Sequence, residues 1–284
     1  MQDARCRLNK HHVSCIMYRV SCILMKVLFI GDIVGKVGRV ATKALLPTIV
    51  NRYKIDLVIA NGENAAGGFG LTENIVSEIL RLGVHIITTG NHIWDKKEFI
   101  TQISKEDRVL RPINYPPGVP GYGSILYSLP NGEKVAVINI SGRVFMSNID
   151  CPFRTGKEEV EKLSSSTKMI IVDFHAEATS EKIAFGYFVD GKVSAVIGTH
   201  THVQTADEKI LPGGTAYITD VGMTGPYNSV IGIEIEQIIQ RFLTNMPMRF
   251  ETAKGEGIFS AIVIEIDEKT GKSTAVQRLQ LKYP

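Results

Sequence analysis

The chain has 284 residues, of which 44% are hydrophobic and 21% are charged, the composition of an ordinary globular protein with a sizeable core. These proportions exclude intrinsic disorder, a collagen-like repeat and a disulfide-dense scaffold. No stretch of the sequence reaches the roughly 18 uninterrupted apolar residues of a membrane span, so we expect no segment that crosses a bilayer.

The net charge of +3 comes from the first 24 residues, where four basic residues face Asp3 alone. The rest of the chain has 28 basic and 28 acidic residues and is neutral. A neutral body has no general attraction for duplex nucleic acid or for an anionic membrane. Three of the four cysteines also lie in the first 24 residues, and a body whose single cysteine is Cys151 suits a reducing cytoplasm.

Residues 1–24 contain no glycine and have no clear periodicity, whereas Met25 opens a strand-like run. We interpret 1–24 as a poorly ordered N-terminal extension or as the product of a start assigned upstream of Met25. A secretory signal is disfavoured because Tyr18 and Arg19 interrupt the apolar stretch that it would need. We expect a single domain over residues 25–284.

Short β-branched runs alternate with amphipathic segments from Met25 onward, which is typical of an α/β or mixed fold. The predicted strands are 26–31, 56–61, 84–89, 134–140, 168–174, 193–198, 215–219 and 258–267. The predicted helices are 39–52, 72–82, 95–103, 156–164, 178–186 and 232–243. Glycine and proline cluster at 62–70 and 112–123, which we interpret as loops within one compact body.

A side chain able to bind a metal or transfer a proton follows five of the predicted strands. In chain order these residues are Asp32, Glu63, Asn64, Asn91, His92, His175, His200 and His202. The carboxyl ends of strands in an α/β sheet meet at one edge, so we expect these side chains to converge. Without His92 they offer two carboxylates, two amides and three imidazoles, more ligands than one zinc ion takes and enough for two cations that share a carboxylate. Oxygen and nitrogen donors without thiolate favour iron, manganese or zinc over copper or calcium.

Each of these residues also has a plainer interpretation. A lone aspartate after a strand is often a helix cap or a turn former, and a His-x-His pair can be two solvated histidines. His85, which lies inside an apolar run, is interpreted as structural. The dinuclear interpretation is favoured because four of the five histidines after Met25 stand at strand ends.

Several motifs resemble those of the calcineurin-like metallophosphoesterases: Gly31-Asp32, Gly90-Asn91-His92, the isolated His175 and the pair His200-x-His202. Longer segments look like the YmdB-type bacterial branch, namely MKVLFIGDIVG at 25–35, NGENAAGGFG at 61–70, TGNHIWD at 89–95 and DFHAEAT at 173–179. The resemblance covers 25–284. Val34 stands where many members of the wider superfamily have histidine, and Glu63 where they have aspartate; both departures match the YmdB branch.

The resemblance implies a calcineurin-like four-layer α/β/β/α double β-sandwich, a single metallophosphoesterase domain with a dinuclear metal site at the carboxyl ends of its strands. It implies that one cation is held by Asp32, Glu63, Asn64 and His202, and the other by Glu63, Asn91, His175 and His200. The implied cofactor is a pair of iron ions (Fe²⁺/Fe³⁺), for which manganese, zinc or magnesium could substitute.

The activity that the resemblance implies is hydrolysis of 2′,3′-cyclic AMP and GMP to 3′-nucleotides by a hydroxide that bridges the two metals. The departing 2′-alkoxide needs a proton, and His92 is the candidate general acid, with Asp95 as the carboxylate that would orient it. The plainer role of His92 is to hydrogen-bond a metal ligand. Phe69 is a candidate base-stacking residue and Tyr227 a further candidate substrate contact.

The expected partner is therefore a small cyclic nucleotide, and neither a membrane nor duplex nucleic acid; the chain could also form a homo-oligomer. Two other functions stay open from the sequence. One is a broader phosphatase or nuclease that uses the same metals. The other is a regulatory protein that senses a nucleotide or binds a partner and in which catalysis is incidental.

Overall fold

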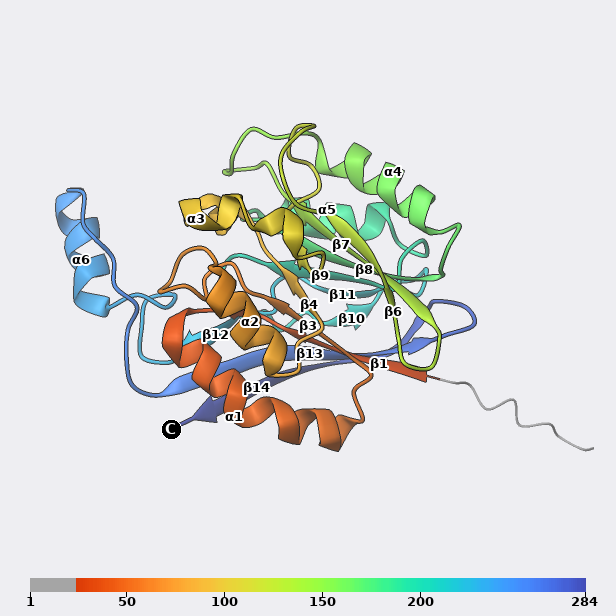
Figure 1. Ribbon diagram of the computed structural model, residues 1–284, viewed down its shortest axis with the longest axis horizontal. Coiled ribbons are helices and arrows are strands. Elements are labelled where there is room, and N and C mark those ends of the chain that lie inside the picture. The colour runs from red at the N-terminus through yellow and green to blue at the C-terminus, as the bar shows by residue number, and fades with distance from the viewer. Residues whose placement is uncertain (1–23) are drawn as a thin grey trace, which may run out of the picture.

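The computed structural model describes residues 24–284 and contains two β-sheets with helices on their outer faces (Figure 1). The predicted extension over 1–24 lies outside the described residues, except that Leu24 is the first residue of a strand. Within the described residues, the first sheet has eight strands: β1 Leu24–Ile30, β2 Asp32–Ile33, β3 Leu57–Asn61, β4 Ile86–Thr88, β5 Val109–Leu110, β12 Met223–Pro226, β13 Gly257–Asp267 and β14 Ser273–Tyr283. The second sheet has six: β6 Ser124–Ser128, β7 Lys134–Ser141, β8 Met169–His175, β9 Ala195–Thr199, β10 Lys209–Ile210 and β11 Ala216–Ile218.

Each sheet has a parallel centre. In the first sheet β1, β3, β4 and β5 run parallel, and β13 pairs antiparallel with β1 and with β14. In the second sheet β7, β8, β9 and β11 run parallel, with antiparallel β6 and β10 at the edges. Parallel strands present their carboxyl ends at a common edge, which is where polar side chains from different strands can meet.

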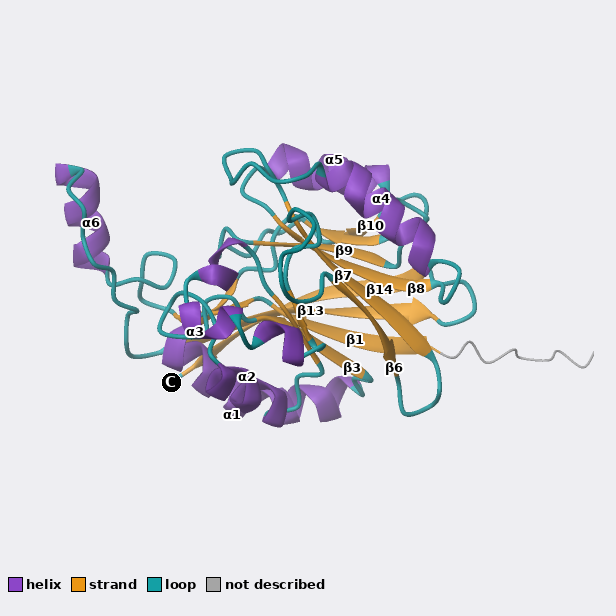
Figure 2. Cartoon of the chain, turned by 45° about the horizontal axis from the view of Figure 1, so that its top comes forward, coloured by secondary structure: helices purple, strands orange, loops and turns teal. Residues whose placement is uncertain are grey.

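The described α-helices cover the outer faces of the two sheets, apart from α6 (Figure 2). They are α1 Gly35–Tyr53, α2 Glu73–Arg81, α3 Lys97–Ile100, α4 Pro152–Leu163, α5 Thr179–Phe188 and α6 Ile235–Thr244, with short 3₁₀ helices η1 Asn91–Trp94 and η2 Ile103–Lys105. In Figure 2, α1, α2 and α3 lie on the side of the first sheet, and α4 and α5 lie on the side of the second. Helix α6 covers neither sheet.

The alternation of side chains along the central strands explains why both faces of each sheet are buried. In β1, Val27 and Phe29 point into a cluster between the two sheets, whereas Leu28 and Ile30 pack in the cluster that contains Leu46 of α1. A strand covered on both faces has an almost continuous apolar run, and this run is why β1 could be predicted from the sequence.

Strand β8 repeats this arrangement in the second sheet. Ile171 lies in the cluster between the sheets, and Ile170 and Phe174 lie in the outer cluster with Val160 of α4 and Phe185 of α5. The Phe174 and Phe185 rings stack with their centroids 4.4 Å apart. The two sheets therefore form one core, and their carboxyl-terminal edges are held in a fixed relation.

All eight predicted strands are present, with boundaries that differ by at most two residues. The predicted helix over 95–103 is wrong as a single element: only α3, Lys97–Ile100, is α-helical there, preceded by extended backbone at Lys96 and followed by a turn into η2. Helix α4 begins before the predicted 156, at Pro152, a residue that suits the first position of a helix.

Six strands were not predicted: β2, β5, β6, β10, β12 and β14. Four of them have between two and four residues, too few to give a periodic signal. Strand β14 has eleven residues but is mostly exposed and rich in polar side chains, so its conformation depends on its pairing with β13. Strand β14 lies at an edge of the sheet, where polar and charged side chains are common because one side of the strand has no neighbouring strand.

Candidate metal centre

The seven predicted ligands come to the carboxyl-terminal edge from both sheets. Strands β1, β3 and β4 of the first sheet end just before Asp32, before Glu63 and Asn64, and before Asn91. Strand β8 of the second sheet ends at His175, and the loop after β9 carries His200 and His202. The predicted convergence is present, and the role of these residues as metal ligands stays a prediction.

Three side chains meet around one nitrogen of His175. Its Nε2 atom lies 3.0 Å from Glu63 Oε1, 3.0 Å from Asn91 Oδ1 and 3.0 Å from His200 Nδ1. An imidazole nitrogen carries at most one proton, so it cannot satisfy three such neighbours at once. Gly90 makes this approach possible, because a Cβ there would lie 2.1 Å from His175 Cδ2. We call Glu63, Asn91, His175 and His200 the inner cluster.

A second group lies beside the inner cluster. Nε2 of His202 is 3.7 Å from Asp32 Oδ1 and accepts a hydrogen bond from Asn64 Nδ2 at 3.1 Å. The backbone N–H of His200 donates to Asp32 Oδ2 at 3.4 Å, which links this group to the inner cluster. We call Asp32, Asn64 and His202 the outer cluster.

Two carboxylate oxygens in these clusters lack hydrogen-bond donors. Among the buried side-chain atoms of residues 24–284, Asp32 Oδ1 and Glu63 Oε1 accept no hydrogen bond, although both carboxylates are fully buried. An unsatisfied buried carboxylate oxygen is costly, and a cation removes that cost. Glu63, His175 and His200 also offer ligand atoms that all lie within 4.8 Å of one another. The donor set present therefore fits metal ions.

The hydrogen bond on the far side of His175 fixes which nitrogen faces the cluster. Nδ1 lies 2.9 Å from Thr199 Oγ1, and the Thr199 hydroxyl donates to Asp173 Oδ1 at 2.7 Å. The hydroxyl proton is thus used by Asp173, so Thr199 accepts from Nδ1–H. That tautomer leaves the lone pair of Nε2 directed at Glu63 and Asn91, as in histidines that bind metals.

The other two imidazoles are oriented in the same way. His202 Nδ1 donates to the carbonyl oxygen of Ile231 at 2.8 Å, and His200 Nε2 lies 3.2 Å from Glu177 Oε2. In both rings the outward nitrogen donates to an acceptor, so the inward nitrogen carries its lone pair toward the clusters; in His202 that lone pair accepts from Asn64 Nδ2. Glu177 and Ile231 were not found from the sequence, because nothing in their local pattern indicates that they contact a ring far away in the chain.

The electrostatics of the metal-free protein reflect the same crowding. Burial raises the pKa of Glu63, but the charge of His175 outweighs it and brings that pKa down to about 2. Burial lowers the pKa of His175, but Glu63 raises it to about 9. Burial and the charge of His175 lower the pKa of His200 to about 3, and burial raises that of Asp32. Without a cation, Glu63 and His175 thus each favour the charged form of the other.

A buried ion pair lies beneath the histidine loop. Lys182 Nζ donates to the carbonyl oxygen of Thr199 and to Asp220 Oδ2, both at 2.7 Å, and Asp220 Oδ2 accepts from the N–H of Thr201 at 3.0 Å. This support matters because His200 and His202 have φ angles of 102° and 65°, a backbone conformation that residues other than glycine rarely adopt. Sequence analysis missed the pair, because a lysine on an amphipathic helix normally faces solvent.

His92 lies at the rim of the centre. Its N–H donates to Glu63 Oε2 at 3.0 Å, and its ring Nδ1 lies 2.8 Å from Asp95 Oδ2, so the expected Asp95 contact is confirmed. The rings of Phe69 and His92 are in edge contact, with centroids 5.0 Å apart. A cavity of about 260 Å³ opens here; its lining includes Glu63, Asn64, Phe69, His92, His200 and His202.

Tyr227 is not among the residues that line this cavity, so the structure gives no support to its predicted substrate contact. Its ring lies under the ammonium group of Lys282, 4.0 Å from the ring centroid, at the end of β14. The residues from that part of the chain that do line the cavity are Ile231 and Ile233. His85 is structural as predicted, since its Nδ1 accepts a hydrogen bond from the N–H of Val58.

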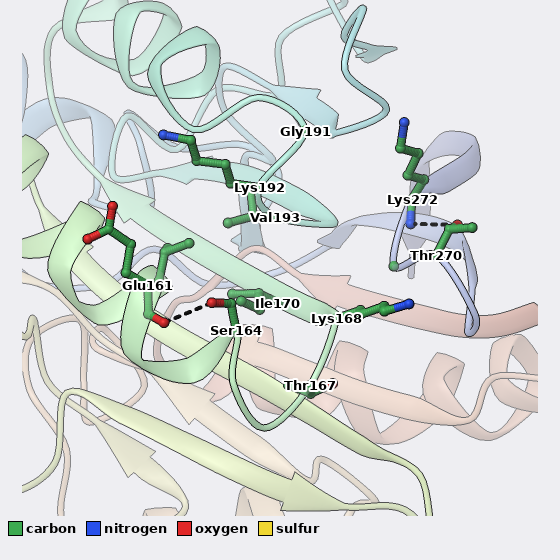
Figure 3. A pocket seen from close by; sticks show the side chains of 12 residues that line it. Glu161, Ser164, Thr167, Lys168, Ile170, Gly191, Lys192, Val193, Thr270 and Lys272 are labelled. Carbon is green, nitrogen blue, oxygen red and sulfur yellow. Dashed lines mark hydrogen bonds between the residues drawn. The ribbon is translucent and has the colours of Figure 1, made fainter.

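A second cavity, of about 320 Å³, lies among the end of α4, the start of β8 and the turn between β13 and β14. Lys168, Lys192 and Lys272 border it, but Figure 3 shows their amino groups spread apart and not directed at one point. Ser164 at its wall donates to the carbonyl oxygen of Glu161 at 2.8 Å. This cavity contains no convergent set of ligands comparable to the two clusters.

None of the helices over residues 24–284 combines the length and the apolar character that crossing a membrane requires.

The chain is similar to known proteins over most of its length. Residues 28–279 match the YmdB-like protein family. The chain is 51% identical, over 255 residues, to the 2′,3′-cyclic-nucleotide 2′-phosphodiesterase of Bacillus subtilis (strain 168), an alignment that covers 90% of this chain and 96% of the relative.

Two solved structures share the fold over nearly the whole chain. A hypothetical protein from Thermus thermophilus is 43% identical with a TM-score of 0.86, covering 92% of this chain and 100% of the other. A novel phosphatase from Mycoplasma pneumoniae is 36% identical, also with a TM-score of 0.86, covering 92% of this chain and 95% of the other.

Proposed function

This chain belongs to the YmdB-like protein family and is an enzyme, and we propose that it hydrolyses 2′,3′-cyclic nucleotides to 3′-nucleotides at the strand-end site. The observation that carries the proposal is the meeting of Glu63 Oε1, Asn91 Oδ1 and His200 Nδ1 at 3.0 Å around His175 Nε2, with Asp32 Oδ1 left without a donor. The name of the Bacillus subtilis relative supports the substrate class.

We also propose that the two sheets and their helices are the calcineurin-like four-layer α/β/β/α sandwich, and that residues 25–284 are one metallophosphoesterase domain. Supporting this, side chains from both sheets build a common cluster, and each sheet has a further cluster beneath its own helices. The free thiol of Cys151, the one cysteine among residues 24–284, fits a reducing compartment such as the cytoplasm.

The inner cluster would hold one cation and the outer cluster the other, with the Glu63 carboxylate shared. Two such cations would supply positive charge to the phosphoryl oxygens and lower the pKa of a water molecule. The ligands are oxygen and nitrogen atoms without thiolate, which favours iron, with manganese, zinc or magnesium as substitutes. Asn64 now presents its Nδ2 atom to His202, and its amide would turn over to present oxygen.

His92 is placed to handle the proton of the reaction. Hydrolysis adds the oxygen of water to phosphorus and breaks the bond from phosphorus to the 2′ oxygen, which leaves with the electron pair. His92 Nε2–H would donate a proton to that oxygen, because Nδ1 is held by Asp95 at 2.8 Å and the ring borders the cavity. A positioned acid matters most for a poor leaving group such as an alkoxide.

The cavity supports a small substrate. Its volume of about 260 Å³ accepts a phosphate and part of a nucleoside but no folded polymer, and Phe69 lines it together with His92. Phe69 is therefore the side chain available for stacking on a base at the mouth of the cavity.

The test compares turnover of 2′,3′-cyclic AMP, 3′,5′-cyclic AMP, bis(p-nitrophenyl) phosphate, p-nitrophenyl phosphate and single-stranded RNA by the same metal-loaded protein. We expect the highest kcat/KM for 2′,3′-cyclic AMP, with 3′-AMP as the product. Turnover of the monoester alone would reject the proposal, and RNA as the best substrate would favour a nuclease.

A further inference from the structure

A tight turn between β12 and α6 lies at the wall of the cavity beside the metal centre. Val230 and Ile233 exchange backbone hydrogen bonds of 2.9 and 3.0 Å across it, and its two central residues are Ile231 and Gly232. Both central residues have positive φ angles, 48° at Ile231 and 102° at Gly232. Turns of this kind normally carry asparagine, aspartate or glycine at the first central position. A β-branched residue there is under backbone strain.

The backbone of Ile231 has a task at the metal centre, but this task does not explain the isoleucine. Its carbonyl oxygen accepts the hydrogen bond from His202 Nδ1 at 2.8 Å. Every residue has a carbonyl group, and glycine or asparagine would present it in this turn with less strain. Strain that persists at a functional site indicates that the strained residue contributes to function. What isoleucine adds here is its branched apolar side chain.

The side chain of Ile231 is available to a ligand in the cavity. Ile231 is 51% exposed, whereas the other two aliphatic residues of the lining, Val34 and Ile233, are 1% and 7% exposed. Those two are packed into the protein, and Ile231 keeps about half of its surface free. Phe69 is the remaining apolar side chain of the lining, and it is half-buried.

The apolar residues of the lining are neighbours. A Cβ added at Gly232 would lie 2.8 Å from Val34 Cγ1. One added at Gly68, the residue before Phe69, would lie 3.9 Å from Ile233 Cδ1. We call Val34, Phe69, Ile231 and Ile233 the apolar wall. None of these four side chains has a hydrogen-bonding atom, so a group that binds there is held by contact with its faces.

A 2′,3′-cyclic nucleotide carries both of the groups that such a cavity suits. Its phosphodiester would lie at the two clusters, and its base is bonded to the carbon next to C2′, so the base stays close to the phosphate. Ile231 is separated from the outer cluster by one ring, that of His202. Imidazole and ribose are both five-membered rings, so the base would extend about as far from the phosphate as Ile231 lies from the outer cluster.

We infer that the Ile231 side chain packs on the base of the substrate, as a specificity-determining contact that favours nucleoside cyclic phosphates over cyclic phosphodiesters without a base. This inference rests on the proposed function, because it places the base of that substrate on the apolar wall. Ile231 then has two roles. Its carbonyl positions His202, and its side chain covers one face of the nucleoside.

The test compares 2′,3′-cyclic AMP with glycerol 1,2-cyclic phosphate, which has the same cyclic phosphodiester ring and no base. Ile231→Asn removes the apolar side chain, and asparagine tolerates a positive φ, so the contact with His202 should persist. We expect KM for 2′,3′-cyclic AMP to rise about 10-fold, with a much smaller change in kcat. The preference for 2′,3′-cyclic AMP, as a ratio of kcat/KM values, should fall about 10-fold.

Three further variants define the role of the side chain. Ile231→Gly also suits a positive φ and should behave like Ile231→Asn, which excludes an effect of the new amide group. Ile231→Leu keeps an apolar side chain of similar volume and should keep most of the preference. The matched control is Val203→Asn, because Val203 is 60% exposed and follows His202 but does not line the cavity. Its kinetics should equal those of the wild type.

Equal losses on the two substrates would show that Ile231 acts only through His202, and would overturn the inference. So would an unchanged KM for 2′,3′-cyclic AMP in both Ile231→Asn and Ile231→Gly. A wild type that leaves 2′,3′-cyclic AMP unhydrolysed is a different result, which rejects the proposed function and the inference together. Elemental analysis of each variant measures the bound metal, which we expect to stay at the wild-type level.

Discussion

The inner and outer clusters of the candidate metal centre are built in different ways. In the inner cluster, His175 and Glu63 are fully buried and three contacts of 3.0 Å meet at one nitrogen. In the outer cluster the contacts are 3.1–3.7 Å, and the side chain of His202 is 12% exposed. The inner cluster is thus the more tightly packed of the two, although both reach the cavity, since the side chain of its His200 is 21% exposed.

The difference follows from what supports each cluster. His175 is the last residue of a central strand and is held from behind by Thr199 and Asp173, both of which lie in strands. His202 lies in a loop and is held by the carbonyl oxygen of Ile231, in the segment between β12 and α6. Strand-supported ligands are positioned more precisely than loop-supported ones, so we expect the inner cation to bind more tightly.

The largest effect is expected from removing the centre of the inner cluster. His175→Ala deletes the nitrogen at which three contacts meet and should lower turnover of 2′,3′-cyclic AMP by at least about 10⁴-fold, with loss of bound metal. Metal analysis together with kcat would measure it. Retention of both metal and activity would show that the cluster is not the catalytic centre.

The next effect concerns chemistry without loss of metal. His92→Ala should keep the metal content and lower kcat by about 10²–10⁴-fold on 2′,3′-cyclic AMP. On bis(p-nitrophenyl) phosphate, whose leaving group needs no proton, the loss should be smaller. Equal losses on the two substrates would contradict the general-acid role, and Asp95→Asn should show a weaker version of the same pattern.

A matched pair of amide variants tests the comparison directly. Asn91→Ala acts on the inner cluster and Asn64→Ala on the outer one, and each should lower affinity for one cation by about 10–100-fold. We expect Asn64→Ala to need a higher concentration of added manganese for rescue than Asn91→Ala, because the same loss would start from the weaker affinity that we expect for the outer cation. Rescue of both variants at the same manganese concentration would contradict the expected difference in cation affinity between the two clusters.

The ion pair of Lys182 and Asp220 beneath the histidine loop is tested through the stability of the folded protein. Lys182→Met leaves the buried carboxylate of Asp220 without its cation and should cost about 3–5 kcal/mol of unfolding free energy. Adding Asp220→Asn should recover part of this loss, which chemical denaturation would measure. If the single variant were as stable as the wild type, the ion pair would not brace the histidine loop.

The smallest expected effect is a pH dependence of the thermal stability of the metal-free protein. Its His175 has a pKa of about 9, above the ordinary 6.5, because Glu63 outweighs burial. The stabilisation of the folded protein by protonated His175 is therefore fully present below about pH 6.5 and is lost as the pH rises through about 9. The melting temperature should fall by a few degrees over that range. Metal-loaded protein and metal-free His175→Gln should not show this fall.

The parts of the molecule that could be predicted from sequence are those where local pattern and burial agree. Strands β1, β3, β4, β8 and β9 have apolar runs because both faces are covered, and each is followed by the polar residue that reaches the site. That succession alone gave Asp32, Glu63, Asn91 and His175 as candidates.

The residues that could not be predicted act across long stretches of chain. Lys182 is an ordinary helical lysine by pattern, and only the fold shows that it is 1% exposed and paired with Asp220. The Ile231 carbonyl belongs to the backbone, which carries no residue-specific signal. Tyr227 was proposed from its place in a glycine-containing loop, but that loop turns its ring toward Lys282 at the end of β14.

The most direct test of two cations sharing Glu63 is elemental analysis of wild type and Glu63→Gln, purified without added metal. We predict about two transition-metal ions per wild-type chain, and less than about one, with loss of activity, in Glu63→Gln. Wild-type protein that hydrolyses 2′,3′-cyclic AMP at full rate after chelation, with no bound metal, would contradict it.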